Sequence, residues 1–95
     1  MNLLYYNEHI KEEMEDACAY VHNALCCKAT NQSQADQFVK LSEQELSHAR
    51  ILYEMYQDEF KGDFEKCPDV HACMSEMYND NLVRIQLLLQ AYSKQ

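Results

Sequence analysis

The sequence has few of the residues that bend or end helices. It contains one glycine, Gly62, and one proline, Pro68, in 95 residues. Residues that favour helices, such as Leu, Ala, Glu, Gln, Met and Lys, make up much of the rest. This composition predicts an all-α protein, and the length fits a single domain over residues 1–95.

Long apolar runs and clustered basic residues are also missing. The run Leu87-Leu88-Leu89 is far shorter than the ~20 apolar residues of a bilayer span. The first residues show no basic stretch followed by an apolar run, so we expect no signal peptide. The formal net charge of −8 disfavours nucleic acid and anionic membrane surfaces as partners, because both attract clustered Lys and Arg. An acidic balance instead suits a protein that binds cations.

The cysteines lack the spacing of a metal-binding pair. None of the five forms Cys-x-x-Cys, which argues against a zinc ribbon or a rubredoxin-type site. Their odd number, with no expected signal peptide, favours reduced thiols in a cytoplasmic protein. We expect most of them to be small packing residues, and they are Cys18, Cys26, Cys27, Cys67 and Cys73.

Turn signals divide the chain into three predicted helices, over residues 3–30, 33–61 and 69–92. Ser33, followed by Asp36, is typical of an N-cap with a capping box. Gly62 predicts a left-handed cap at the end of the second helix. Pro68 suits the first position of the third helix, with Asp69 favourable at its positive end. The short connection at Thr30–Ser33 predicts an antiparallel hairpin of the first two helices.

The most informative motif lies in the second helix. Its apolar face is marked by Phe38, Leu41, Leu52 and Met55. Glu45 and His48 fall in the middle of that face. Because a buried, unpaired carboxylate is costly, these two residues need a partner or a metal. A carboxylate and an imidazole three residues apart can bind the same ion. This Glu-x-x-His element is used in helix bundles that hold two carboxylate-bridged irons.

The first helix supplies the matching carboxylate. Glu13 lies within its apolar face, which we expect to comprise Tyr6, Ile10, Ala17, Tyr20 and Ala24. Glu12, Glu15 and Asp16 flank it, and an error of one face would give its role to Glu12 or Asp16. In the antiparallel hairpin Glu13 lies near residue 50, within a turn of Glu45 and His48. Tyr20, seven residues after Glu13, is either a hydrogen-bond donor to the ligands or a core aromatic. His9 and His22 lie on other faces.

The third helix has a less regular apolar stripe and no second Glu-x-x-His. We expect the stripe to comprise Val70, Met74, Met77 or Tyr78, Asn81, Ile85, Leu88 and Tyr92. Its potential ligands, Glu76, Asp80 and His71, are interpreted as solvated.

Glu13, Glu45 and His48 together make half of a dinuclear ligand set. In ferritin-like sites two helices each give a Glu and two others each give Glu-x-x-His. A two-fold homodimer in which both hairpins build one four-helix bundle would complete the set. Its donors suit Fe, or alternatively Mn, better than Zn or Cu(I). Glu45 would bridge the ions, with Glu13 and His48 as terminal ligands, and open positions would admit O₂ or peroxide. A metal-free helical dimer, in which these residues pair with one another or with Arg50, is the alternative.

These residues resemble the ferritin-like superfamily. The resemblance rests on Glu13, Tyr20 and the string Glu45-Leu-Ser-His48-Ala49, and it covers about residues 8–60. Within the superfamily the chain is most similar to encapsulated ferritins, and more widely to rubrerythrin-type domains. The resemblance implies Fe(II) oxidation by O₂ at a site between subunits, in a dimer or a larger oligomer of dimers, with an encapsulin shell as a candidate partner. It also implies an acidic entry site, at Glu12 and Glu15.

The chain departs from the family pattern at several positions. Cys18 and Ala19 stand where the family has an acidic residue and an aromatic residue. The residues Ser93-Lys94-Gln95 lack the Gly- and Leu-containing tail that addresses cargo to a shell. A rubrerythrin-like di-iron peroxidase remains an alternative function, although the missing rubredoxin cysteines argue against it.

Overall fold

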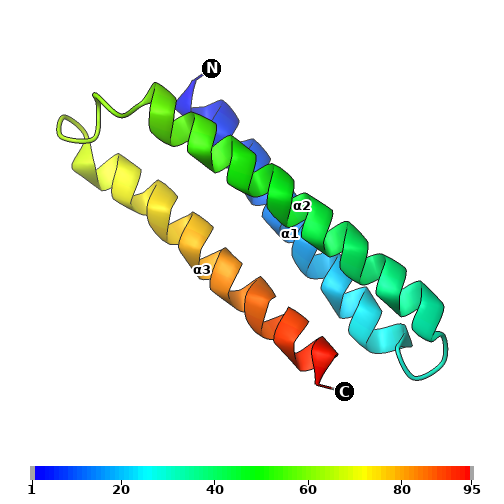
Figure 1. The fold of residues 1–95 in the computed structure, drawn as a ribbon. Coiled ribbons are helices and arrows are strands. Elements are labelled where there is room, and N and C mark those ends of the chain that lie inside the picture. The colour runs from blue at the N-terminus through cyan, green and yellow to red at the C-terminus, as the bar shows by residue number, and fades with distance from the viewer. Residues whose placement is uncertain (1, 95) are drawn as a thin grey trace.

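The computed structural model describes residues 2–94, which form three α-helices and no strand (Figure 1). These are α1 (Leu3–Cys27), α2 (Gln32–Glu59) and α3 (Pro68–Ser93). The predicted all-α class is confirmed, and every helix end lies within three residues of its predicted place. α1 and α2 form an antiparallel hairpin, and α3 runs beside it in the same direction as α1, in a rod of 52 × 20 × 15 Å.

The two helices of the hairpin pack through small side chains. Ala35, Ser42 and Ala49 of α2 recur every seven residues and are fully buried. Ala17 and Ala24 face them from α1 and are equally buried. The Ser42 hydroxyl donates a hydrogen bond of 2.7 Å to the carbonyl oxygen of Ala17. Because helix separation depends on side-chain size at the contact, this seam lets α1 and α2 approach closely.

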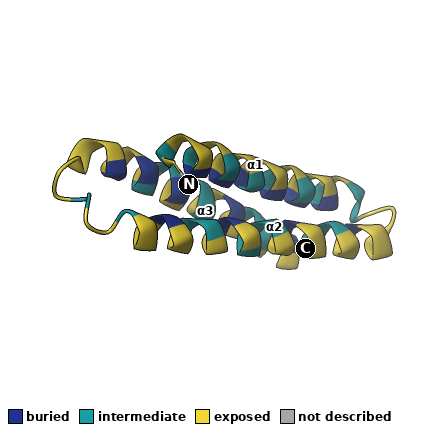
Figure 2. Ribbon diagram, turned by 90° about the horizontal axis from the view of Figure 1, so that it is seen from above, coloured by how far each residue is buried: buried dark blue, intermediate teal, exposed yellow. Residues whose placement is uncertain are grey.

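The buried face of α1 is largely the predicted one, whereas the buried face of α2 differs from the prediction. In α1 four residues of the predicted face are buried, and they are Tyr6, Ile10, Ala17 and Ala24. Met14 and Val21 are also buried, whereas Glu13 and Tyr20 are only partly buried. In α2, Leu41 and Met55 are 38% and 42% exposed, so their predicted burial is wrong within the single chain. The physical reason is that the small residues, rather than the large aliphatic ones, form the closest helix contact. Figure 2 shows the buried residues as a strip along the inner side of each helix.

Two predicted helix caps are also wrong. Asn31, not Ser33, is the N-cap of α2, and its side-chain oxygen accepts a hydrogen bond of 3.0 Å from the backbone N–H of Gln34. α2 ends at Glu59, before Gly62, whose φ is not positive. Pro68 begins α3 as predicted, and Asp69 lies in its first turn.

α3 covers one side of the hairpin. The ring of Tyr78 stacks on Tyr53 of α2, with centroids 3.9 Å apart and planes 2° apart. Of the predicted stripe, Met74, Tyr78, Ile85 and Tyr92 are buried, whereas Val70 is exposed. The prediction that His71 is solvated is wrong, because its side chain is 6% exposed. Within residues 2–94, no helix is both long and apolar enough to cross a bilayer.

Candidate metal centre

The hairpin brings together the three residues that the sequence singles out. Glu13 of α1 and Glu45 and His48 of α2 each offer one ligand atom, and these atoms lie within 4.8 Å of one another. The Nδ1 atom of His48 lies 3.6 Å from Oε2 of Glu13. This is the one group of three or more candidate ligands among the described residues.

The helix register explains this convergence. Across the hairpin the ring of Tyr6 contacts Tyr56, and the ring of Tyr20 stacks on Phe38. Glu13 lies midway between Tyr6 and Tyr20 in the sequence, so it meets the middle of α2. Ala49, fully buried in the small-residue seam, directly follows His48 and holds this part of α2 against α1.

The electrostatics of the site are unfavourable without a cation. The neighbouring Glu13 carboxyl raises the pKa of Glu45 from its ordinary 4.5, because a proton shared between the two carboxyls favours the neutral form. Burial raises it further, whereas the nearby His48 lowers it. The Oε2 atom of Glu13 is buried and has no hydrogen-bond partner among residues 2–94. A divalent cation would satisfy this oxygen and remove the repulsion between the carboxylates.

The site lies at the surface of the hairpin, on the side away from α3. Leu46 and Arg50 line a groove with residues of α3. Helical periodicity places Glu45 and His48 on the opposite side of α2. The side chains of Glu13 and His48 are 26% and 58% exposed, so one side of the group is open. The position of Arg50 also argues against its predicted role as a partner of the site residues.

The other predicted site residues lie around this centre. Glu12, Glu15 and Asp16 are exposed on α1, and an entry role for Glu12 and Glu15 stays a prediction. Tyr20 is half-buried, with its ring stacked on Phe38 at a centroid distance of 6.3 Å. Its role as a hydrogen-bond donor to the ligands likewise stays a prediction.

The sequence did not reveal a buried polar network near the C-terminal end of α2 and the start of α3. His71 Nδ1 lies 2.5 Å from the Tyr56 hydroxyl, and His71 Nε2 lies 3.0 Å from Oδ2 of Asp63. One sequence signal could have indicated the burial of His71. It lies seven residues before Tyr78, which begins a seven-residue repeat with Ile85 and Tyr92.

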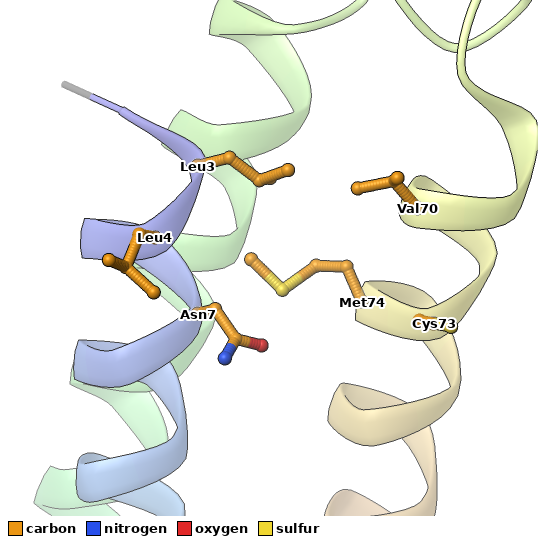
Figure 3. Close-up of a pocket in the computed structure, with 6 residues that line it drawn as sticks. All are labelled: Leu3, Leu4, Asn7, Val70, Cys73 and Met74. Atoms are coloured by element: carbon orange, nitrogen blue, oxygen red, sulfur yellow. The ribbon is translucent and has the colours of Figure 1, made fainter.

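A larger groove lies between the first turns of α1 and α3 and holds no candidate ligand cluster. Its volume is about 530 Å³, and Figure 3 shows Leu3 and Met74 pointing into the space between these helices. The lining is mostly apolar and comprises Leu3, Leu4, Asn7, Val70, Cys73 and Met74. The groove therefore has no acidic or imidazole group with which to bind a cation.

Comparison of the chain with protein-family models, curated proteins and solved structures gave no match. Membership of the ferritin-like superfamily therefore stays a prediction that rests on the residues quoted above.

Proposed function

We propose that the protein binds iron at Glu13, Glu45 and His48 and oxidises Fe(II) with O₂ at a dinuclear site formed by two copies of the chain. One observation carries the proposal: two carboxylates and an imidazole from two helices meet within 4.8 Å, and a buried Glu13 oxygen has no hydrogen-bond partner among the described residues. An oxygen-rich donor set with one imidazole suits iron, or alternatively Mn.

The proposal assigns a different role to each of the three residues. Glu45, which interacts with both Glu13 and His48, would bridge two ions. Glu13 and His48 would each complete the coordination of one ion. Two Fe(II) ions would supply two electrons to O₂, which takes up two protons and leaves as H₂O₂. A bound cation would favour the ionised form of Glu45, against the carboxylate neighbour and the burial that raise its pKa.

A second copy of the chain would complete the ligand set. One chain offers three ligands, whereas dinuclear helix-bundle sites of this type use six. Leu41 and Met55 lie on the same side of α2 as Glu45 and His48, one on either side of them, and are exposed in the single chain. Two hairpins that pack through this face would bury both apolar residues and bring the two half-sites together.

Anaerobic titration of the metal-free protein with Fe(II), followed by admission of air, tests the proposal. We expect two irons per dimer, then a rise in ferric absorbance as O₂ is consumed. The variant Glu45→Ala should lose both. Glu43→Ala is the matched control, because Glu43 lies on the same helix but faces the groove toward α3. Equal iron binding by the two variants, or none by the unmodified protein, would refute the proposal.

A metal-free dimerisation module is the second candidate. The 3.6 Å approach of His48 to Glu13 favours it, since a protonated His48 could pair with that carboxylate. In this case replacement of Glu13, Glu45 and His48 by Leu should stabilise the dimer, because apolar residues replace a half-buried charged group. Under the iron proposal the same triple variant loses Fe(II) binding, and Fe(II) no longer raises its melting temperature.

A further inference from the structure

Tyr56, His71 and Asp63 form a hydrogen-bonded chain from the core to the surface. Tyr56 lies on α2, His71 lies on α3, and Asp63 belongs to the connection between them. The two contacts of His71 are 2.5 Å to the Tyr56 hydroxyl and 3.0 Å to the Asp63 carboxylate. Tyr56 and His71 are buried, whereas the Asp63 side chain is 41% exposed. The proposed iron site uses none of these residues.

The chemistry of the three groups fixes the direction of the hydrogen bonds. An ionised carboxylate can only accept hydrogen bonds, so Nε2 of His71 carries a hydrogen and donates a hydrogen bond to Asp63. In the neutral imidazole Nδ1 is then the acceptor, and the Tyr56 hydroxyl donates to it. The phenol of Tyr56 therefore points its proton at a base, which is in turn oriented by a carboxylate.

The surroundings of Tyr56 keep its phenol neutral. Burial, with smaller contributions from Tyr53 and Asp63, raises the pKa of Tyr56 to about 12. The rings of Phe60 and Phe64 also contact it, with centroids 5.7 and 6.0 Å away. A neutral phenol in an apolar site loses an electron easily only if its proton leaves at the same time. His71 lies where it can take that proton.

We propose that Tyr56 is a redox-active tyrosine whose proton is accepted by His71. Its phenol would give one electron to a strong one-electron oxidant, such as a hydroxyl radical, while the O–H proton moves to Nδ1 of His71. The products are a neutral tyrosyl radical, an imidazolium facing the Asp63 carboxylate, and hydroxide from the oxidant. Return of one electron, with the proton from His71, restores the phenol.

Neighbouring aromatic side chains extend from Tyr56 to Tyr53 and on to Tyr78 of α3. Tyr53 lies 5.6 Å from Tyr56 by ring centroid and stacks on Tyr78 at 3.9 Å. A pocket of about 230 Å³ beside this group is lined by Tyr53, Tyr56, Gln57, Phe64, His71 and Ser75. Oxidising equivalents formed elsewhere could thus collect at Tyr56. A role as a sink for radicals from Fe(II) and H₂O₂ rests on the proposed function, whereas the redox chemistry of Tyr56 does not.

Photo-oxidation of the metal-free protein tests the proposal without iron. A photoexcited ruthenium polypyridyl complex with a sacrificial electron acceptor oxidises the full chain, and freeze-quenched samples are examined by electron paramagnetic resonance. We expect a long-lived neutral tyrosyl radical that is lost in Tyr56→Phe and retained in the control Tyr92→Phe, because Tyr92 lies in a separate core cluster. In His71→Gln, which cannot hold the proton as a cation, the radical yield should fall. Circular dichroism establishes that each variant keeps its helices.

The unmodified protein supplies a second measurement, which requires no substitution. Electron–nuclear double resonance should show one exchangeable proton hydrogen-bonded to the radical oxygen, which disappears in D₂O. A radical without such a proton, the same long-lived signal in Tyr56→Phe, or no tyrosyl radical in the folded unmodified protein would each overturn the proposal. None of these results depends on whether the chain binds iron.

Discussion

The Nδ1 atom of His48 lies 3.6 Å from Oε2 of Glu13, although the two residues belong to different helices. Glu45 lies one turn before His48 and shares the same space, so two carboxylates face each other at a half-buried position. Such an arrangement is unfavourable in a protein without metal and becomes favourable when a cation is present.

Replacement of one carboxylate should stabilise the metal-free protein. The raised pKa of Glu45 means that the folded chain holds this proton more tightly than the unfolded chain. The stabilisation that the folded chain gains from this proton is therefore complete below pH 4.5, the ordinary pKa of a glutamate. It is lost as the pH rises through the raised pKa of Glu45. Glu45→Gln should remove this loss and increase the free energy of unfolding at pH 7, with a smaller difference from the unmodified protein at pH 4.

Urea unfolding of metal-free samples between pH 4 and 8 measures this effect. Glu43→Gln, an exposed residue of the same helix, is the control and should leave the pH profile unchanged. If Glu45→Gln destabilises the metal-free protein at pH 7, Glu13 and Glu45 do not repel each other as described.

Several features of the fold could be predicted from local sequence signals. Pro68 marks the start of α3, and the polar stretch around Asn31 marks the hairpin turn. These breaks set the helix lengths, and hence the register that brings Glu13 close to Glu45 and His48. The meeting of the three residues thus follows from helix length and antiparallel pairing.

The buried face of α2 could not be predicted as securely, because this helix offers two overlapping stripes of residues that could pack. Leu41 and Met55 are more apolar than Ala35 and Ser42, yet the small residues form the seam. Helix separation decides between the stripes, and it is a property of the pair rather than of either sequence. The hydrogen bonds of His71 likewise depend on Tyr56 of α2 and Asp63 of the connection. No sequence motif marks these two residues as its partners.

Gly62 provides a test of the corrected cap. Its φ is not positive, and a Cβ built on it would meet nothing within 4 Å. Gly62→Ala should therefore stabilise the protein by roughly 0.5 kcal/mol, because alanine restricts the unfolded chain without strain in the folded one. Urea unfolding measures the change. A clear destabilisation would indicate a left-handed backbone at this position, as the sequence alone had suggested.

The exposed face of α2 should mediate dimer formation under the proposed function. Leu41→Glu places a charge beside Glu45 on this face and should weaken dimerisation by roughly 2 kcal/mol or more. Val83→Glu is the matched control, since Val83 is exposed on α3 and lies outside the proposed interface. Sedimentation velocity across a concentration series distinguishes them. A dimer that tolerates Leu41→Glu but not Val83→Glu would place the interface on α3 instead.

The small-residue seam should control the metal centre through helix separation. Ala49 is fully buried directly after His48, so Ala49→Leu would force additional methyl groups between α1 and α2. We expect a loss of roughly 2 kcal/mol in unfolding free energy from overpacking. We also expect weaker Fe(II) binding, because the wider hairpin moves Glu13 away from Glu45 and His48. Ala72→Leu, at an exposed position of α3, should change neither quantity. Parallel measurement of thermal unfolding and Fe(II) affinity separates the two effects: a destabilised but still folded variant that binds Fe(II) normally would show that the site does not depend on the seam.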